Sequence, residues 1–147
     1  MFQNILVALD GSKQALKAAD VATDLAVKYD ARVTFLTVTK RLQVGGAVKK
    51  YLEVENLLGE PQYVIDEMTE EIIAEAKKAA AGKGLATLKT EVREGNPARS
   101  IVEYAKADKS DLIVLGSRGL GDIEGGLLGS VSHKVASLAP CTVITVK

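Results

Sequence analysis

Apolar runs typical of buried strands alternate along this chain with segments of helical periodicity. Two of the runs, Asn4–Asp10 and Asp111–Leu115, are nearly continuous, as in strands that are covered on both faces, whereas Leu88–Arg93 alternates polar and apolar residues like a strand near a sheet edge. The predicted strands are Asn4–Asp10, Arg32–Val38, Leu88–Arg93, Asp111–Leu115 and Cys141–Val146. Strand–helix alternation of this kind predicts an α/β fold, with a parallel sheet, right-handed crossovers and helices on both faces. We expect residues 1–147 to form a single domain.

Polar capping residues mark the expected starts of the helices. Ser12 follows the first strand and can cap a helix over Lys13–Tyr29. Asn96 can cap a helix whose first residue is Pro97, a position at which proline is well tolerated. The last helix is expected to begin at Ser130.

Pro61 opens the longest predicted helix, which is expected to end near Gly82 or Gly84. Its apolar stripe, expected to face the core, consists of Val64 (with Ile65), Met68, Ile72 and Ala76. The preceding stretch, Lys40–Pro61, has two open interpretations. It could be a short helix packed on the fold, or a surface that recognises a partner.

Composition excludes several classes of partner. The chain has 19 basic and 19 acidic residues, so no net field attracts nucleic acid or anionic lipid. No apolar stretch approaches the ~18–20 residues that a membrane-spanning helix needs, and the N-terminus lacks a basic leader pattern. We therefore expect a cytoplasmic protein that is not inserted in a membrane.

Cys141 is the only cysteine, which rules out an intrachain disulfide and suggests a small core residue.

A glycine-rich stretch follows the fourth predicted strand and ends where the last predicted helix begins. Six of the fourteen residues from Gly116 to Gly129 are glycine. Ordering so many glycines is entropically unfavourable, so they indicate close backbone approach to a ligand. A helix start presents unpaired N–H groups and the positive end of a dipole, which together attract phosphate. The stretch therefore predicts a phosphate site.

Two common phosphate-binding motifs do not fit. A P-loop needs Gly-Lys-Ser/Thr, but the only Gly-Lys pair is Gly82-Lys83, followed by Gly84. A dinucleotide fingerprint beginning at Gly119 would place Glu124 where its last glycine belongs. It would also follow the fourth strand instead of the first.

The pattern Gly-x2-Gly-x9-Gly-Ser resembles the nucleotide-binding signature of the universal stress protein family. Four further blocks resemble that family: the opening Ile-Leu-Val-Ala-Leu-Asp-Gly-Ser, the Gly-Asn-Pro before a helix, Asp-Leu-Ile-Val-Leu-Gly-Ser-Arg-Gly, and the closing Ala-Pro-Cys-Thr-Val. The resemblance implies a Rossmann-like, adenine nucleotide alpha hydrolase-like sheet with strand order 3-2-1-4-5. Because the signature is complete, it also implies ATP binding and a role in stress or metabolic regulation.

The resemblance implies a role for each matching residue. Asp10 would hold the ribose hydroxyls, Val38 would meet the adenine edge through its backbone, and Ala8 and Leu115 would line the pocket. Towards the phosphates, Gly116 and Gly119 would allow close backbone approach, and Arg118 would either approach the phosphates or lie in solvent. The expected N–H and hydroxyl donors to the outer phosphates are Gly129, Ser130, Val131 and Ser132.

Without a P-loop lysine, side chains leave the triphosphate charge largely unpaired. We therefore expect Mg²⁺ or Mn²⁺ to bridge the phosphates with few protein ligands, which the sequence does not identify. No base stands out beside the glycine-rich stretch, so hydrolysis is expected to be slow at best. The favoured hypothesis is an ATP-controlled regulator of an unidentified protein partner, and the resemblance implies a transporter or an enzyme as that partner. The alternatives are a slow ATPase or other nucleotide-processing enzyme, and a constitutive dimeric interaction module with structural ATP.

The last strand also predicts self-association. In the order 3-2-1-4-5, Cys141–Val146 would lie at a sheet edge. Its Thr-Val-Ile-Thr-Val sequence favours β-structure and contains no lysine or proline to discourage pairing. We expect a symmetric homodimer joined through this edge.

Overall fold

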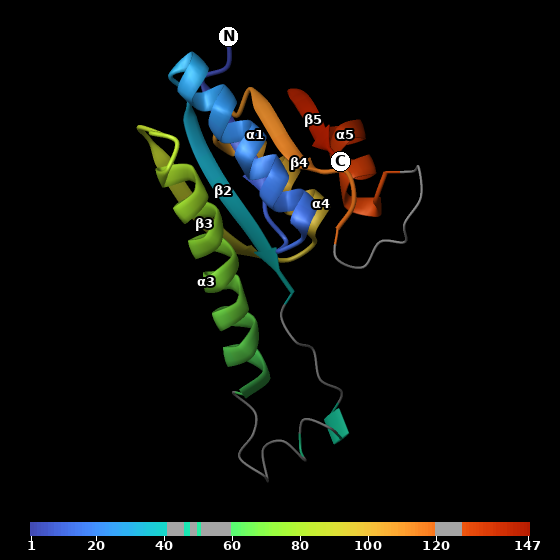
Figure 1. The fold of residues 1–147 in the computed structure, drawn as a ribbon. Coiled ribbons are helices and arrows are strands. Elements are labelled where there is room, and N and C mark those ends of the chain that lie inside the picture. The colour runs from blue at the N-terminus through green and yellow to red at the C-terminus, as the bar shows by residue number, and fades with distance from the viewer. Residues whose placement is uncertain (41–45, 48–49, 51–59, 120–127) are drawn as a thin grey trace.

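A computed structural model describes residues 1–40, 46–47, 50, 60–119 and 128–147. Its strands form one five-stranded parallel sheet in the order β3-β2-β1-β4-β5, which confirms the predicted fold and strand order (Figure 1). The strands are β1 (Asn4–Ala8), β2 (Arg32–Thr39), β3 (Leu88–Glu94), β4 (Leu112–Gly116) and β5 (Thr142–Val146).

Two helices cover each face of the sheet (Figure 1). One face carries α1 (Lys13–Tyr29) and α3 (Glu60–Ala81), and the other carries α4 (Pro97–Ala107) and α5 (Ser130–Leu138). Most of the stretch Lys40–Pro61 lies outside the described residues, so its two interpretations stay open. Among the described helices, none has the length and apolar character needed to cross a membrane.

Alternating side chains of the strands fill two apolar layers. On β1, Ile5 and Val7 point towards α1 and α3, whereas Leu6 points towards α4 and α5. Helix α1 contacts the sheet through small side chains, which allow the helix to lie close to the strands. These are Ala15, Ala18, Ala19, Ala22 and Ala26.

The predicted caps are confirmed. The Ser12 hydroxyl accepts a hydrogen bond from the Ala15 N–H at 3.1 Å, and the Asn96 side chain accepts one from the Arg99 N–H at 3.1 Å. Pro97 is the first residue of α4. Each cap satisfies an N–H that has no partner inside its helix.

Helix α3 differs from the expectation in its buried face. Val64 and Met68 are 51% and 54% exposed, so their predicted burial is wrong. The stripe is buried only further along, where Ile72 packs on the core and Ala76 is inside it. Figure 1 shows the reason, since the N-terminal half of α3 extends past the end of β2 and has no sheet beneath it.

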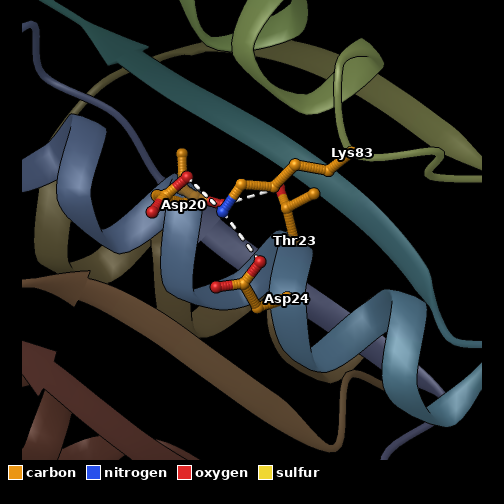
Figure 2. Close-up of polar contacts among 5 residues, drawn as sticks. Asp20, Thr23, Asp24 and Lys83 are labelled. Carbon is orange, nitrogen blue, oxygen red and sulfur yellow. Dashed lines mark hydrogen bonds and ion pairs between the residues drawn. The ribbon is translucent and has the colours of Figure 1, made fainter.

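Ion pairs connect the C-terminal end of α3 to α1. Lys83, just after α3, pairs with Asp20 and donates to the Asp24 carboxylate at 2.7 Å (Figure 2). These hydrogen bonds, first to Asp20 and then to Asp24, raise the pKa of Lys83 above its ordinary value of 10.5. Between the two aspartates, the Thr23 hydroxyl donates to the Ala19 carbonyl inside α1 at 2.7 Å.

Candidate functional site

A cavity of about 570 Å³ lies at the carboxyl ends of β1, β2 and β4, beside the starts of α1, α4 and α5. Its volume is within the range of small-molecule sites. Ligands in open α/β sheets bind at this edge, at the point where strand order reverses. The cavity brings together ten of the residues predicted from the sequence: Ala8, Asp10, Val38, Leu115, Gly116, Arg118, Gly119, Ser130, Val131 and Ser132.

One side of the cavity is apolar. Its wall continues the core layer under α4 and α5, so it is backed by tightly packed aliphatic side chains. The residues that form it are Ala8, Leu36, Val38, Ile101 and Leu115. Such a wall can take the flat face of a heteroaromatic ring out of water.

Asp10 is held at the cavity by a tight turn after β1. One of its carboxylate oxygens accepts a hydrogen bond from the Ser12 N–H at 2.9 Å. Gly11 has a φ of +86°, a conformation that favours glycine, and a Cβ there would lie 2.9 Å from the Ile72 side chain. The other Asp10 oxygen has no partner among the described residues, so it can accept from a ligand hydroxyl.

The start of α5 also lines the cavity. Its N-cap is Gly129, so no side chain caps the helix. The first helical bond runs from the His133 N–H to the Gly129 carbonyl at 2.9 Å. The N–H groups of Ser130, Val131 and Ser132 therefore have no acceptor within the helix. Together with the helix dipole, they make this end of the cavity suited to an anion.

Two of the expected phosphate donors already have protein acceptors. The Gly129 N–H donates to the Ser117 carbonyl at 2.7 Å, and Gly129 is not among the described lining residues. The Ser132 hydroxyl donates to the same carbonyl at 2.6 Å, with the Gly129 carbonyl 3.0 Å away. These two groups fix the start of α5, which leaves the first-turn amides and the Ser130 hydroxyl to face a ligand.

Gly116 has a packing role that the sequence did not reveal. A Cβ at this position would lie 2.9 Å from the Gln14 Cβ and 3.2 Å from the Ala15 N. Glycine is therefore needed because the first turn of α1 lies against the end of β4. This contact brings the turn after β4 within reach of the Gln14 side chain.

Three further residues of the site were not singled out from the sequence. Lys40 lines the cavity at the end of β2. Gln14 and Ser117 hold the turn after β4 and do not line the cavity among the described residues. Ser117 lies inside the glycine motif and could have been suspected, whereas nothing in the helical periodicity distinguishes Gln14 from other polar residues of α1.

Few of the described residues around the cavity are of the types that usually act in catalysis or bind a metal ion. They contain no group of three or more His, Cys, Asp or Glu side chains arranged to hold a metal ion. His133 is exposed on α5 and does not line the cavity. Cys141 is half-buried against the core, and burial raises the pKa of its thiol, which keeps it protonated at neutral pH. Residues 120–127 of the glycine-rich stretch, Glu124 included, lie outside the described residues.

Comparison with known proteins gives a consistent result over the full length. The model of the Universal stress protein family matches residues 1–147. Universal stress protein YxiE of Bacillus subtilis (strain 168) is 37% identical over 154 residues, covering 100% of both chains. The solved universal stress protein UspA from Lactobacillus plantarum is 31% identical with a TM-score of 0.78, over 99% of this chain and 98% of that one. A universal stress protein solved in complex with cAMP is 30% identical with a TM-score of 0.71, over 99% and 97%.

Proposed function

The chain belongs to the universal stress protein family, and from this premise we propose that it binds ATP in the cavity at the carboxyl ends of β1, β2 and β4 and thereby regulates a protein partner. In this proposal residues 1–147 act as one cytoplasmic domain. The observation that carries it is the uncapped start of α5, which shares one cavity with Asp10 and an apolar wall.

The cavity offers a matching environment for each part of the nucleotide. Adenine would lie against the apolar wall, with the backbone of Val38 at its edge. The free oxygen of Asp10 would accept from the ribose hydroxyls. The first-turn amides of α5 and the exposed hydroxyl of Ser130 would donate to the phosphates, with the turn at Gly119 close beside them. The relative that is 30% identical and was solved with cAMP supports an adenine nucleotide as the ligand.

A divalent cation fits this arrangement only as a partner of the phosphates. The described residues contain no cluster of acidic, histidine or cysteine ligands for it, so most of its ligands would come from the nucleotide and water. We propose that Mg²⁺ or Mn²⁺ binds together with ATP. The cation would neutralise part of the triphosphate charge, because the chain has no P-loop lysine to do so.

Regulation is favoured over turnover because the cavity offers few groups for chemistry. Asp10 is the only acidic residue among the described lining residues, and it is tied to the Ser12 N–H. Phosphoryl transfer needs a positioned nucleophile and stabilisation of charge on the outer phosphate. We expect ATP to be retained, with little phosphate released. Steady phosphate release by the purified protein would instead support the slow ATPase.

Calorimetric titration with ATP, AMP, cAMP and GTP tests the nucleotide proposal. ATP with Mg²⁺ is expected to bind most tightly, and EDTA is expected to weaken its binding. Asp10→Asn should weaken binding about tenfold, equivalent to ~1.4 kcal/mol, because a ribose acceptor loses its charge. The matched control is Glu75→Gln, the same loss of charge at an exposed position of α3, which should leave affinity unchanged. No heat with any adenine nucleotide at millimolar concentration would refute ATP binding.

Self-association is a separate part of the proposal. In the described sheet β5 pairs only with β4, so its outer edge carries unpaired backbone groups. We propose that this edge joins two copies as a symmetric homodimer.

A further inference from the structure

We propose that Gln14 is a positioning residue for nucleotide binding, because its side chain fixes the turn after β4 and, through Ser117, the start of α5. The inference rests on the proposed nucleotide site and adds to it a residue that is not among the described lining residues. Gln14 would thereby hold the turn at Gly119 and the start of α5, which carries the proposed phosphate donors, in one relative orientation.

The Gln14 side chain holds the turn after β4 through two hydrogen bonds. The Gln14 side-chain oxygen accepts a hydrogen bond from the Arg118 N–H at 2.7 Å and another from the Ser117 hydroxyl at 3.0 Å. Two successive residues of the turn are thus bound to one acceptor on the first turn of α1. Arg118 and Gly119, on this same turn, line the cavity.

Ser117 connects the turn after β4 to the start of α5. Ser117 is 3% exposed, and its carbonyl accepts from both the Gly129 N–H, at 2.7 Å, and the Ser132 hydroxyl, at 2.6 Å. A single carbonyl therefore holds the N-cap and the first turn of α5. The Ser117 N–H donates to the Val146 carbonyl at 2.7 Å, which also anchors the residue to the end of β5.

Close packing makes this connection stiff. Because Gly116 has no side chain, the first turn of α1 lies against the end of β4, where a Cβ would come within 3.2 Å of a backbone nitrogen. A shift of the turn therefore changes the Gln14 contacts directly. Protein interiors are close-packed, and they therefore transmit such shifts instead of absorbing them.

Loss of the Gln14 acceptor has a predictable result. The Arg118 N–H and the Ser117 hydroxyl would lose their common partner, and the turn would have to find new hydrogen bonds. The Ser117 carbonyl would move with the turn, and the start of α5, which this carbonyl holds, would shift relative to the rest of the cavity. Nucleotide affinity should therefore fall although no group that touches the nucleotide has been removed.

The experiment compares three variants with the wild type. Gln14→Met keeps the length of the side chain and removes the acceptor, whereas Gln14→Glu keeps an acceptor oxygen. Gln3→Met is the matched control, since Gln3 is exposed near the amino end of β1 and its side chain forms no hydrogen bond with any residue that the structure describes. The readouts are calorimetric ATP affinity, the urea midpoint, and exchange of the Arg118 and Gly129 amide hydrogens without nucleotide.

We expect Gln14→Met to weaken ATP binding at least about tenfold, which corresponds to ~1.4 kcal/mol. It should also speed exchange of both amides by a similar factor, while Gln14→Glu and Gln3→Met leave exchange at the wild-type rate. Unchanged Gly129 exchange in Gln14→Met, or unchanged ATP affinity, would overturn the positioning role. If the wild type itself fails to bind ATP, the proposed function fails, and the Gly129 exchange rate still decides whether Gln14 positions the start of α5.

Discussion

Replacing Gly116 by alanine tests the packing on which the site depends. The added methyl would lie 2.9 Å from the Gln14 Cβ, 3.2 Å from the Ala15 N and 3.2 Å from the Arg118 carbonyl oxygen. The last two are backbone atoms, so no rotamer change relieves their contacts. Either the start of α1 or the turn after β4 must shift, and both belong to the cavity edge.

The expected loss of stability follows from these contacts. Inserting a methyl group into a well-packed site destabilises by typically ~1–3 kcal/mol. Reduced freedom of the unfolded chain on changing glycine to alanine offsets about 0.5 kcal/mol of this loss. We therefore expect a net decrease of ~0.5–2.5 kcal/mol in the free energy of unfolding. With a urea m-value of ~2 kcal/mol/M, the midpoint should fall by ~0.3–1.2 M.

Urea unfolding followed by circular dichroism measures this difference, with Gly82→Ala as the control. At Gly82 an added Cβ would meet only the Ala79 carbonyl oxygen at 3.6 Å, which is an ordinary contact. The free energy of unfolding should therefore change by less than ~0.5 kcal/mol. The ATP affinity of Gly116→Ala should also decrease, because Gln14 is displaced from the turn. Equal urea midpoints for the two variants would show that Gly116 is not required by the contact between α1 and β4.

Two further predictions concern the surface and the assembly. Lys83→Met should destabilise by about 0.2–1 kcal/mol at pH 7, because it removes a partly exposed ion-pair cluster. Since the pKa of Lys83 is raised in the folded state, its stabilisation is complete below the ordinary value of 10.5 and disappears as pH rises through the folded pKa. A wild-type advantage in urea midpoint that stays the same at pH 7 and well above pH 10.5 would contradict this. Val143→Lys and Ile144→Lys should each convert the proposed dimer into folded monomers, as measured by light scattering after size exclusion. A dimer unaffected by both changes would exclude the β5 edge as its interface.

Local sequence signals were sufficient for most of the fold. The helix caps followed from residues close together in the chain, as at Ser12 and Asn96, whereas the strand order followed from the family resemblance. The buried face of α3 was misjudged at Val64 and Met68, because periodicity identifies one face of a helix and does not say how far a sheet extends beneath it.

The supports of the site were harder to predict than the residues that line it. Gln14 and Ser117 are 103 residues apart, and their contact exists only once β4 and α1 are packed together. Ser132 shows a related limit, since a hydroxyl expected to donate to phosphate donates instead to a backbone carbonyl. Sequence patterns indicate which groups can donate, whereas the folded chain decides which of them are still free.

In the proposed complex, main-chain amides at the start of α5 hold the phosphates of the nucleotide. Titration of isotope-labelled protein with ATP, followed by backbone amide resonances, tests this contact. We predict the largest shifts at Ser130, Val131 and Ser132, with smaller shifts at Gly119, and none of comparable size at the exposed end of α3. Saturable ATP binding that leaves the amides of Ser130 to Ser132 unshifted would show that these amides do not hold the phosphates.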